Sequence, residues 1–282
     1  MNTARIQAML VTDLDGTLLG SGGQLSPVDR EALMALEAVG VARVVATGRS
    51  LYSLQQAVGS DLPVDYVVFS MGAGIITYPE ARLIRKVDMT PQEVSGAVEI
   101  FMGLELDFML HQPVPDNHCF MYHATGRDNP DFYRRLQRYE KFARPLERLP
   151  HVWEPASQLL AVVNHDTMNT VMPVLQQQLA GYSVIRSTSP LDGVSAWVEV
   201  FSRGVSKSQS VGWLAERLHV RWDHVVAVGN DYNDLDLLEW AGTGYLVDNA
   251  PTVLKSRFPL VASHDHGGVA EAAHRWLTSH FT

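Results

Sequence analysis

The stretch Asp13-Leu14-Asp15-Gly16-Thr17-Leu18 directly follows an apolar segment, Ile6–Thr12. An apolar run that ends at a glycine turn is typical of a buried strand in a parallel sheet. Open sheets of this kind bind ligands beyond the carboxyl ends of their strands. The carboxylates of Asp13 and Asp15 are therefore expected at a ligand-binding edge, and Gly16 allows the chain to turn there.

Similar apolar runs recur along the chain and alternate with helix-like segments. This alternation predicts an α/β fold with a doubly wound, Rossmann-like parallel-sheet core. Ser26 and Pro27 indicate the start of the first helix and Gly40 its end, with Leu33, Leu36 and Val39 on one face. The candidate core strands are Ile6–Thr12, Arg43–Ala46, Tyr66–Phe69, Val198–Phe201, Val225–Val228 and Tyr245–Val247.

The middle of the chain has its own succession of helix and strand patterns. Thr90, Pro91 and Glu93 resemble a capping box, and an apolar helical stripe follows them. We therefore expect a discontinuous core formed by residues 1–79 and 189–282, with a smaller α/β domain inserted at 80–188. The strands expected within the insert are Asp107–His111, Cys119–His123, Leu159–Asn164 and Tyr182–Arg186.

Composition narrows the class of protein. The 282 residues include 31 acidic and 22 basic side chains, and the net charge of −9 disfavours binding to a nucleic-acid backbone. Cys119 is the only cysteine, so no intrachain disulfide forms. No secretory signal or membrane-length apolar run is found, so we expect a cytoplasmic protein with no membrane partner. Its oligomeric state stays open.

Three further segments carry groups suited to phosphate chemistry. The turn Ala46-Thr47-Gly48-Arg49 places a hydroxyl and amides after the second apolar strand, and Lys207 opens a helix after another. Gly229–Asp234 is a second acidic cluster at a strand end. Carboxylates as close as Asp13 and Asp15 repel each other unless a cation compensates, and hard oxygen ligands favour Mg²⁺.

Together these segments resemble the four ordered motifs of the haloacid dehalogenase superfamily of aspartate-dependent phosphohydrolases. Asp248–Pro251 and Gly267–Ala270 resemble the closing segments of its Cof-type branch. The resemblance covers residues 6–79 and 190–277 and implies that the insert is a cap between the second and third motifs. It also implies that this cap selects the substrate.

The resemblance implies a role for each matching residue. Asp13 is the expected nucleophile, and Asp15 the general acid and then the base. The residues expected to hold the phosphoryl group are Thr47, Gly48, Lys207 and Asn233. The residues expected to hold Mg²⁺ are Asp13, Asp15 through its carbonyl, Asn230 and Asp234.

Two positions depart from the pattern of the branch. Asn230 stands where it usually has aspartate, and Met71 stands where it commonly has asparagine. Either Asn230 binds the metal through its oxygen while Asp231 or Asp234 supplies charge nearby, or metal affinity is reduced. Met71 removes the polar contact that asparagine would make.

The expected function is that of a magnesium-dependent phosphatase acting on a small phosphomonoester, a phosphosugar or sugar-acid phosphate. It would proceed through an aspartyl-phosphate intermediate. Two alternatives remain at this point: a phosphomutase similar to phosphomannomutase, and a non-catalytic protein that binds a phosphorylated ligand. The natural substrate and the pathway stay open.

Overall fold

The computed structural model describes residues 6–58, 61–147 and 152–280. These residues form two compact units. The first holds the described residues up to Arg49, Ser53–Arg85 and those from Ser206 onward, and the second holds Ser50–Tyr52 and the described part of Lys86–Val205. Within the described ranges, no helix combines the length and apolar character needed to cross a membrane.

The first unit is built on an eight-stranded sheet with the order β14-β13-β12-β1-β2-β3-β4-β5. Its neighbours pair in parallel from β14 to β3, and β4 pairs antiparallel with β3. The central strand β1 lies between β12 and β2, so three loops meet at its carboxyl end. The strands are β1 (Ala8–Thr12), β2 (Val41–Ala46), β3 (Tyr66–Phe69), β4 (Gly74–Thr77), β5 (Leu83–Lys86), β12 (Val225–Gly229), β13 (Thr243–Val247) and β14 (Leu260–Val261).

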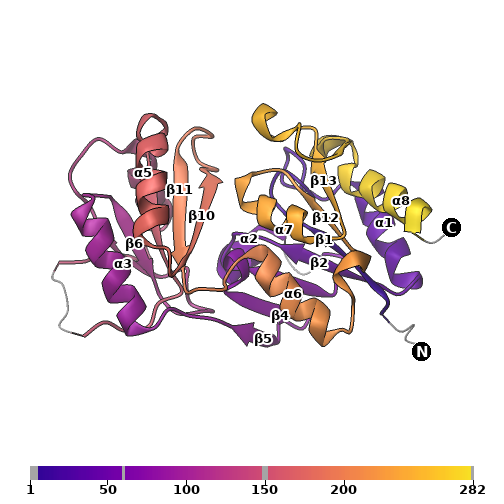
Figure 1. Ribbon diagram of the computed structural model, residues 1–282, viewed down its shortest axis with the longest axis horizontal. Helices are drawn as coiled ribbons and strands as arrows, with labels where there is room; N and C mark the ends of the chain where they lie inside the picture. The colour runs from indigo at the N-terminus through magenta and orange to yellow at the C-terminus, as the bar shows by residue number, and fades with distance from the viewer. Residues whose placement is uncertain (1–5, 59–60, 148–151, 281–282) are drawn as a thin grey trace. The chain divides into compact units, whose positions relative to one another are not determined.

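Helices cover both faces of this sheet (Figure 1). Apolar residues of α6 and α7 pack with alternate residues of the strands in one core cluster, whereas α1 and α8 pack together on the other face. The helices are α1 (Pro27–Ala38), α2 (Leu51–Val58), α6 (Lys207–Arg217), α7 (Leu235–Trp240) and α8 (Gly268–His280). Single 3₁₀ turns occur at η1 (Ser70–Gly72), η2 (Trp222–His224), η3 (Tyr232–Asp234), η4 (Thr252–Leu254) and η5 (His264–His266).

The second unit is a six-stranded sheet with the order β10-β11-β9-β6-β7-β8. All neighbouring pairs are antiparallel except β7 and β8. Helices α3 and α5 bury one face, and α4 packs on the opposite face. The elements are α3 (Pro91–Gly103), β6 (Phe108–His111), β7 (Phe120–His123), α4 (Pro130–Arg138), β8 (Ala143–Pro145), β9 (Gln158–Val163), α5 (His165–Gln178), β10 (Ser183–Thr188) and β11 (Ala196–Phe201).

Local capping patterns predicted the helix starts well. Ser26 caps α1 through Asp29, and Thr90 and Glu93 form the expected capping box at α3. The first helix ends at Ala38, close to the end that Gly40 indicated, but Val39, expected on its apolar face, is the cap residue and is 58% exposed. An α/β fold with a parallel core sheet is confirmed.

One strand was assigned to the wrong sheet. Val198–Phe201 was predicted in the core, but β11 pairs on both sides with β9 and β10 of the second unit. The compact units divide between Arg85 and Lys86 and between Val205 and Ser206, with Ser50–Tyr52 also in the second unit, whereas the sequence predicted domain bounds of 79/80 and 188/189. An apolar run shows that a strand is buried on both faces, but it does not identify its neighbours.

Candidate active site

The loop after β1 begins at the edge where the parallel strands end. The Asp13 amide donates to the carbonyl of Val228 at 2.9 Å, which ties this loop to the end of β12. Gly16 has a positive φ of +74°, and a Cβ there would lie 2.8 Å from the side-chain nitrogen of Asn230. Glycine is therefore required by both the turn and the close approach of the neighbouring loop.

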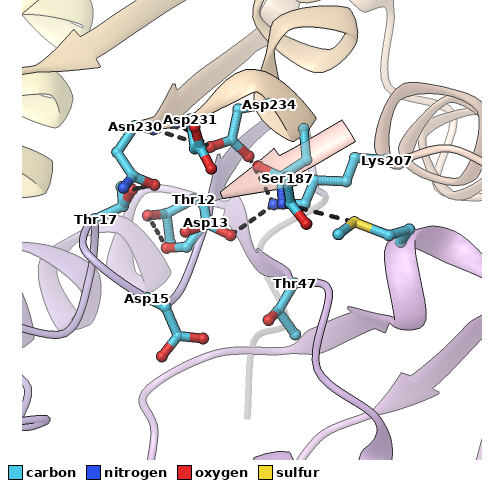
Figure 2. Close-up of polar contacts among 12 residues, drawn as sticks. Thr12, Asp13, Asp15, Thr17, Thr47, Ser187, Lys207, Asn230, Asp231 and Asp234 are labelled. Carbon is cyan, nitrogen blue, oxygen red and sulfur yellow. Dashed lines mark hydrogen bonds and ion pairs between the residues drawn. The ribbon is translucent and has the colours of Figure 1, made fainter. Parts of the chain in front are cut away.

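Lys207 connects three segments that are far apart in the sequence. It is the first residue of α6, whose start is capped by the Ser206 hydroxyl. Its Nζ donates to an oxygen of Asp13 and to an oxygen of Asp234, each at 2.6 Å (Figure 2). All three side chains are almost fully buried, so these are charge-assisted hydrogen bonds screened from water.

Burial controls the charge state of this cluster. Burial raises the pKa of Asp13 to about 7; Lys207 opposes the rise, while the carboxylates of Asp234 and Asp15 add to it. Burial by itself would lower the pKa of Lys207, but Asp13 and Asp234 outweigh it and hold that pKa above its ordinary value. Lys207 is thus a permanent cation, and a further positive charge beside Asp13 would favour its carboxylate.

The loop after β12 is organised by Asp234. One of its oxygens accepts hydrogen bonds from the amides of Asn230 and Asp231, at 2.9 and 3.1 Å, while the other accepts from Lys207. Gly229 is required here, because a Cβ would lie 2.5 Å from the Cβ of Asp234. Asp234 therefore fixes both the lysine and the turn that carries Asn230.

The loop after β2 supplies a hydroxyl and a close turn. Thr47 is buried, its amide donates to the carbonyl of Val68 at 2.8 Å, and its hydroxyl accepts from the Arg49 amide at 3.1 Å. A Cβ at Gly48 would lie 2.4 Å from the terminal methyl of Met71. The expected residues Asp13, Thr47, Lys207 and Asp234 all lie at the carboxyl edge of the core sheet (Figure 2).

Comparison with known proteins identifies the family. A family model for haloacid dehalogenase-like hydrolases matches residues 10–272. The chain belongs to the haloacid dehalogenase-like hydrolases. The predictions of this superfamily and of a hydrolytic enzyme are thereby confirmed.

Three members illustrate what the chain resembles. The pyridoxal phosphate phosphatase YbhA of Escherichia coli is 27% identical, with coverage of 92% of this chain and 93% of that protein. The 5-amino-6-(5-phospho-D-ribitylamino)uracil phosphatase YcsE of Bacillus subtilis is 22% identical, with coverage of 95% of each. The solved structure of the subclass IIB sugar phosphatase BT4131 matches with a TM-score of 0.69 at 17% identity, covering 96% of this chain and 99% of that one.

Asn230 and Met71, the two departures from the Cof-type pattern of this hydrolase family, both make defined contacts in the structure. The side-chain oxygen of Asn230 accepts from the Thr17 hydroxyl at 3.1 Å, so the amide is held at the edge of the site. Met71 adopts a left-handed conformation, with φ of 54°, and its sulfur lies 3.7 Å from the side-chain nitrogen of Asn233, which donates to it. A polar contact therefore exists at Met71, although a thioether is a weak acceptor.

The candidate metal ligands in the loops around Asp13 are all oxygens. In the part of the chain that the structure describes, no three His, Cys, Asp or Glu side chains are grouped so that they could hold a metal ion. The loops do offer the carboxylate of Asp13, the carbonyl of Asp15 and the amide oxygen of Asn230. This donor set is hard, as Mg²⁺ prefers, and the raised pKa of Asp13 is what a bound cation would lower.

Sequence reasoning missed the partner of Asp15. Arg49 was noted only as part of a turn, but its guanidinium holds both carboxylate oxygens of Asp15, each at 2.7 Å. Since β1 and β2 are adjacent parallel strands, residues that follow them face one edge. That adjacency, with an arginine directly after the Thr47-Gly48 turn, was the available indication.

Proposed function

We propose that this hydrolase is a magnesium-dependent phosphatase that acts on a small phosphomonoester through a covalent intermediate on Asp13. The observation that carries the proposal is the buried contact of Lys207 with Asp13 and Asp234 at the carboxyl edge of the sheet. A buried lysine there opposes protonation of the nucleophile and lies beside a site for phosphoryl oxygens. Phosphoryl transfer needs mainly this kind of alignment and charge neutralisation.

The first half-reaction uses both aspartates of the β1 loop. An oxygen of Asp13 attacks phosphorus, and the bond from phosphorus to the leaving oxygen breaks. Asp15 gives its proton to that oxygen, so the product leaves as an alcohol. Thr47, Gly48, Lys207 and Asn233 hold the phosphoryl oxygens during the transfer.

The second half-reaction uses the same groups with water. The oxygen of water attacks phosphorus, and Asp15 takes the proton of that water. The bond between phosphorus and Asp13 breaks, which releases inorganic phosphate and restores both carboxyl groups to their starting states. Because the proton moves in opposite directions in the two half-reactions, a single carboxyl group can act first as acid and then as base.

A magnesium ion would be held by Asp13, the carbonyl of Asp15 and Asn230. When bound, it supplies positive charge that offsets repulsion between the carboxylate and the phosphoryl oxygens. Asp234 would supply negative charge close to this set while it keeps Lys207 and the amides of the β12 loop in place. Of the two expectations for Asn230, we favour direct ligation through its oxygen.

We further propose a phosphosugar or sugar-acid phosphate as substrate. YcsE is named for a phosphorylated ribityl compound and BT4131 for sugar phosphates, and both match nearly the whole chain. In this proposal the first unit carries the chemistry, and the second unit, as the cap, selects the substrate.

Phosphate release tests this function directly. A panel of sugar phosphates, sugar-acid phosphates and pyridoxal phosphate would be incubated with Mg²⁺ and, separately, with a chelator. Release of inorganic phosphate that requires Mg²⁺ and is lost in Asp13→Asn supports the proposal. Isomerisation without net phosphate would indicate a phosphomutase, and ligand binding without turnover would indicate a binding protein; either result contradicts it.

A further inference from the structure

The carboxylate of Asp15 is held on the side of the β1 loop that does not face Lys207. Its two oxygens accept from Nε and Nη2 of Arg49, each at 2.7 Å. Figure 2 shows Asp15 apart from the contacts that join Lys207 to Asp13 and Asp234. A two-pronged pair of this kind fixes the plane of the carboxylate as well as its position.

Arg49 is itself held by the loop after β2. Its amide donates to the Thr47 hydroxyl, and its carbonyl accepts from the Ser70 amide at 2.8 Å. Its Nη1 donates to the carbonyl of Ser53, in α2, at 3.1 Å. The backbone of Arg49 thus belongs to the turn that presents Thr47, whereas its guanidinium contacts Ser53 and Asp15. A change of the side chain alone therefore affects Asp15 and leaves the backbone contacts of the turn in place.

The pair is also open enough to break during turnover. The side chain of Asp15 is 46% exposed and that of Arg49 is 29% exposed. Ion pairs at this exposure are weak because water and salt screen them. By contrast, Lys207 and its two carboxylate partners are almost fully buried. The pair of Asp15 with Arg49 is therefore the more easily broken of the two ion-pair arrangements at this site.

The paired geometry suits one half-reaction and not the other. In this pair both oxygens of Asp15 accept from N–H groups of Arg49, so the carboxyl group presents acceptors, as a base does, and no O–H donor. Asp15 must leave Arg49 to protonate the leaving oxygen, and the pair can form again once that proton has been given up.

We propose that Arg49 is a positioning residue that holds the Asp15 carboxylate for attack of water on the aspartyl-phosphate. This inference rests on the proposed function and deepens it, because it assigns Arg49 to the second half-reaction. Arg49 therefore affects the fraction of the enzyme that is phosphorylated during steady turnover.

The experiment compares the two half-reactions in the full-length enzyme with Mg²⁺. With para-nitrophenyl phosphate, the leaving group departs without a proton, so the rapid burst of nitrophenolate reports transfer to Asp13 and the steady rate reports hydrolysis. In Arg49→Gln, we expect the burst rate to stay unchanged and the steady rate to fall on the order of 10–100-fold. The fraction of enzyme trapped as phosphoenzyme by acid should rise, and Arg49→Lys, which keeps the charge without the fork, should lie between the two.

Arg30→Gln is the matched control, because Arg30 forms an exposed ion pair with Asp61 in the same unit. It should leave both phases unchanged, and unfolding curves of all variants show whether they fold. If Arg49→Gln and Arg49→Lys lower both phases equally or change neither, the inference is overturned while the proposed function stands. If the wild-type enzyme releases phosphate neither from para-nitrophenyl phosphate nor from any member of the sugar-phosphate panel, the proposed function itself fails.

Discussion

Replacing Lys207 by methionine is the most informative single change in the core. Methionine fills a similar volume but removes the cation between two carboxylates, which are themselves 7% exposed or less. Breaking a buried ion pair by deleting one partner costs about 3–5 kcal/mol, because the remaining charge has no compensation. For a unit of this size, that corresponds to a fall in melting temperature of about 6–20 °C.

The expected loss depends on pH in a defined direction. The folded-state pKa of Asp13 is about 7, above the ordinary value of 3.8, so the folded protein binds a proton more readily than the unfolded chain between these values. Asp13 therefore destabilises the fold progressively as pH rises from about 4 to 7. Without Lys207 this window extends upward, so the loss in Lys207→Met should be larger at pH 8 than at pH 5.5.

Denaturant unfolding without Mg²⁺ measures this loss. Lys255→Met is the control, since Lys255 forms an exposed pair with Asp248 and should cost under about 1 kcal/mol. The double variant Lys207→Met/Asp234→Asn should recover part of the loss, because it removes one of the stranded carboxylates. A loss in Lys207→Met no greater than in Lys255→Met, at both pH values, would refute the reasoning.

Two other predictions concern His111 and Asn230. Burial, with the nearby charge of Arg135, lowers the pKa of His111 from 6.5 to about 3, so stability is lost as pH falls through this window, by about 2 kcal/mol at pH 5. Unfolding of wild type and His111→Gln at pH 8 and pH 5 checks this; an equal acid sensitivity in both would contradict it. Asn230→Asp adds a carboxylate ligand beside Asp13, so the apparent affinity for Mg²⁺, measured by titrating activity, should rise on the order of 10-fold. An unchanged or lower affinity would show that this side chain does not bind the metal.

The sequence indicated where the candidate site residues lie because these residues directly follow strand ends. Asp13 and Thr47 come just after β1 and β2, and a parallel sheet brings such ends together whatever the loops contain. Lys207 was also expected at this edge, and it lies there although the strand used to argue for it, β11, belongs to the other sheet. Lys207 is the first residue of α6, and its long side chain reaches Asp13 although the strand before it does not belong to the core sheet.

Features that depend on side-chain rotamers or on strand pairing were not predictable in this way. The adjacency of β1 and β2 indicated that Arg49 and Asp15 share an edge, but their pairing also requires both side chains to turn toward each other, which no spacing rule specifies. The placement of β11 required knowledge of its partners, because the apolar pattern of Val198–Phe201 fits either sheet. The sulfur contact of Met71 with Asn233 likewise arises from a left-handed backbone that methionine rarely adopts.

The central claim is that Asp13 becomes covalently phosphorylated during turnover. The enzyme would be mixed with a sugar phosphate that it hydrolyses and Mg²⁺, quenched in acid within one turnover, digested, and analysed by mass spectrometry. We predict the added mass of one phosphoryl group on Asp13 in the wild-type enzyme and none in Asp13→Asn. Phosphate release at a normal rate from Asp13→Asn, or a phosphoryl group on a different residue, would contradict the account.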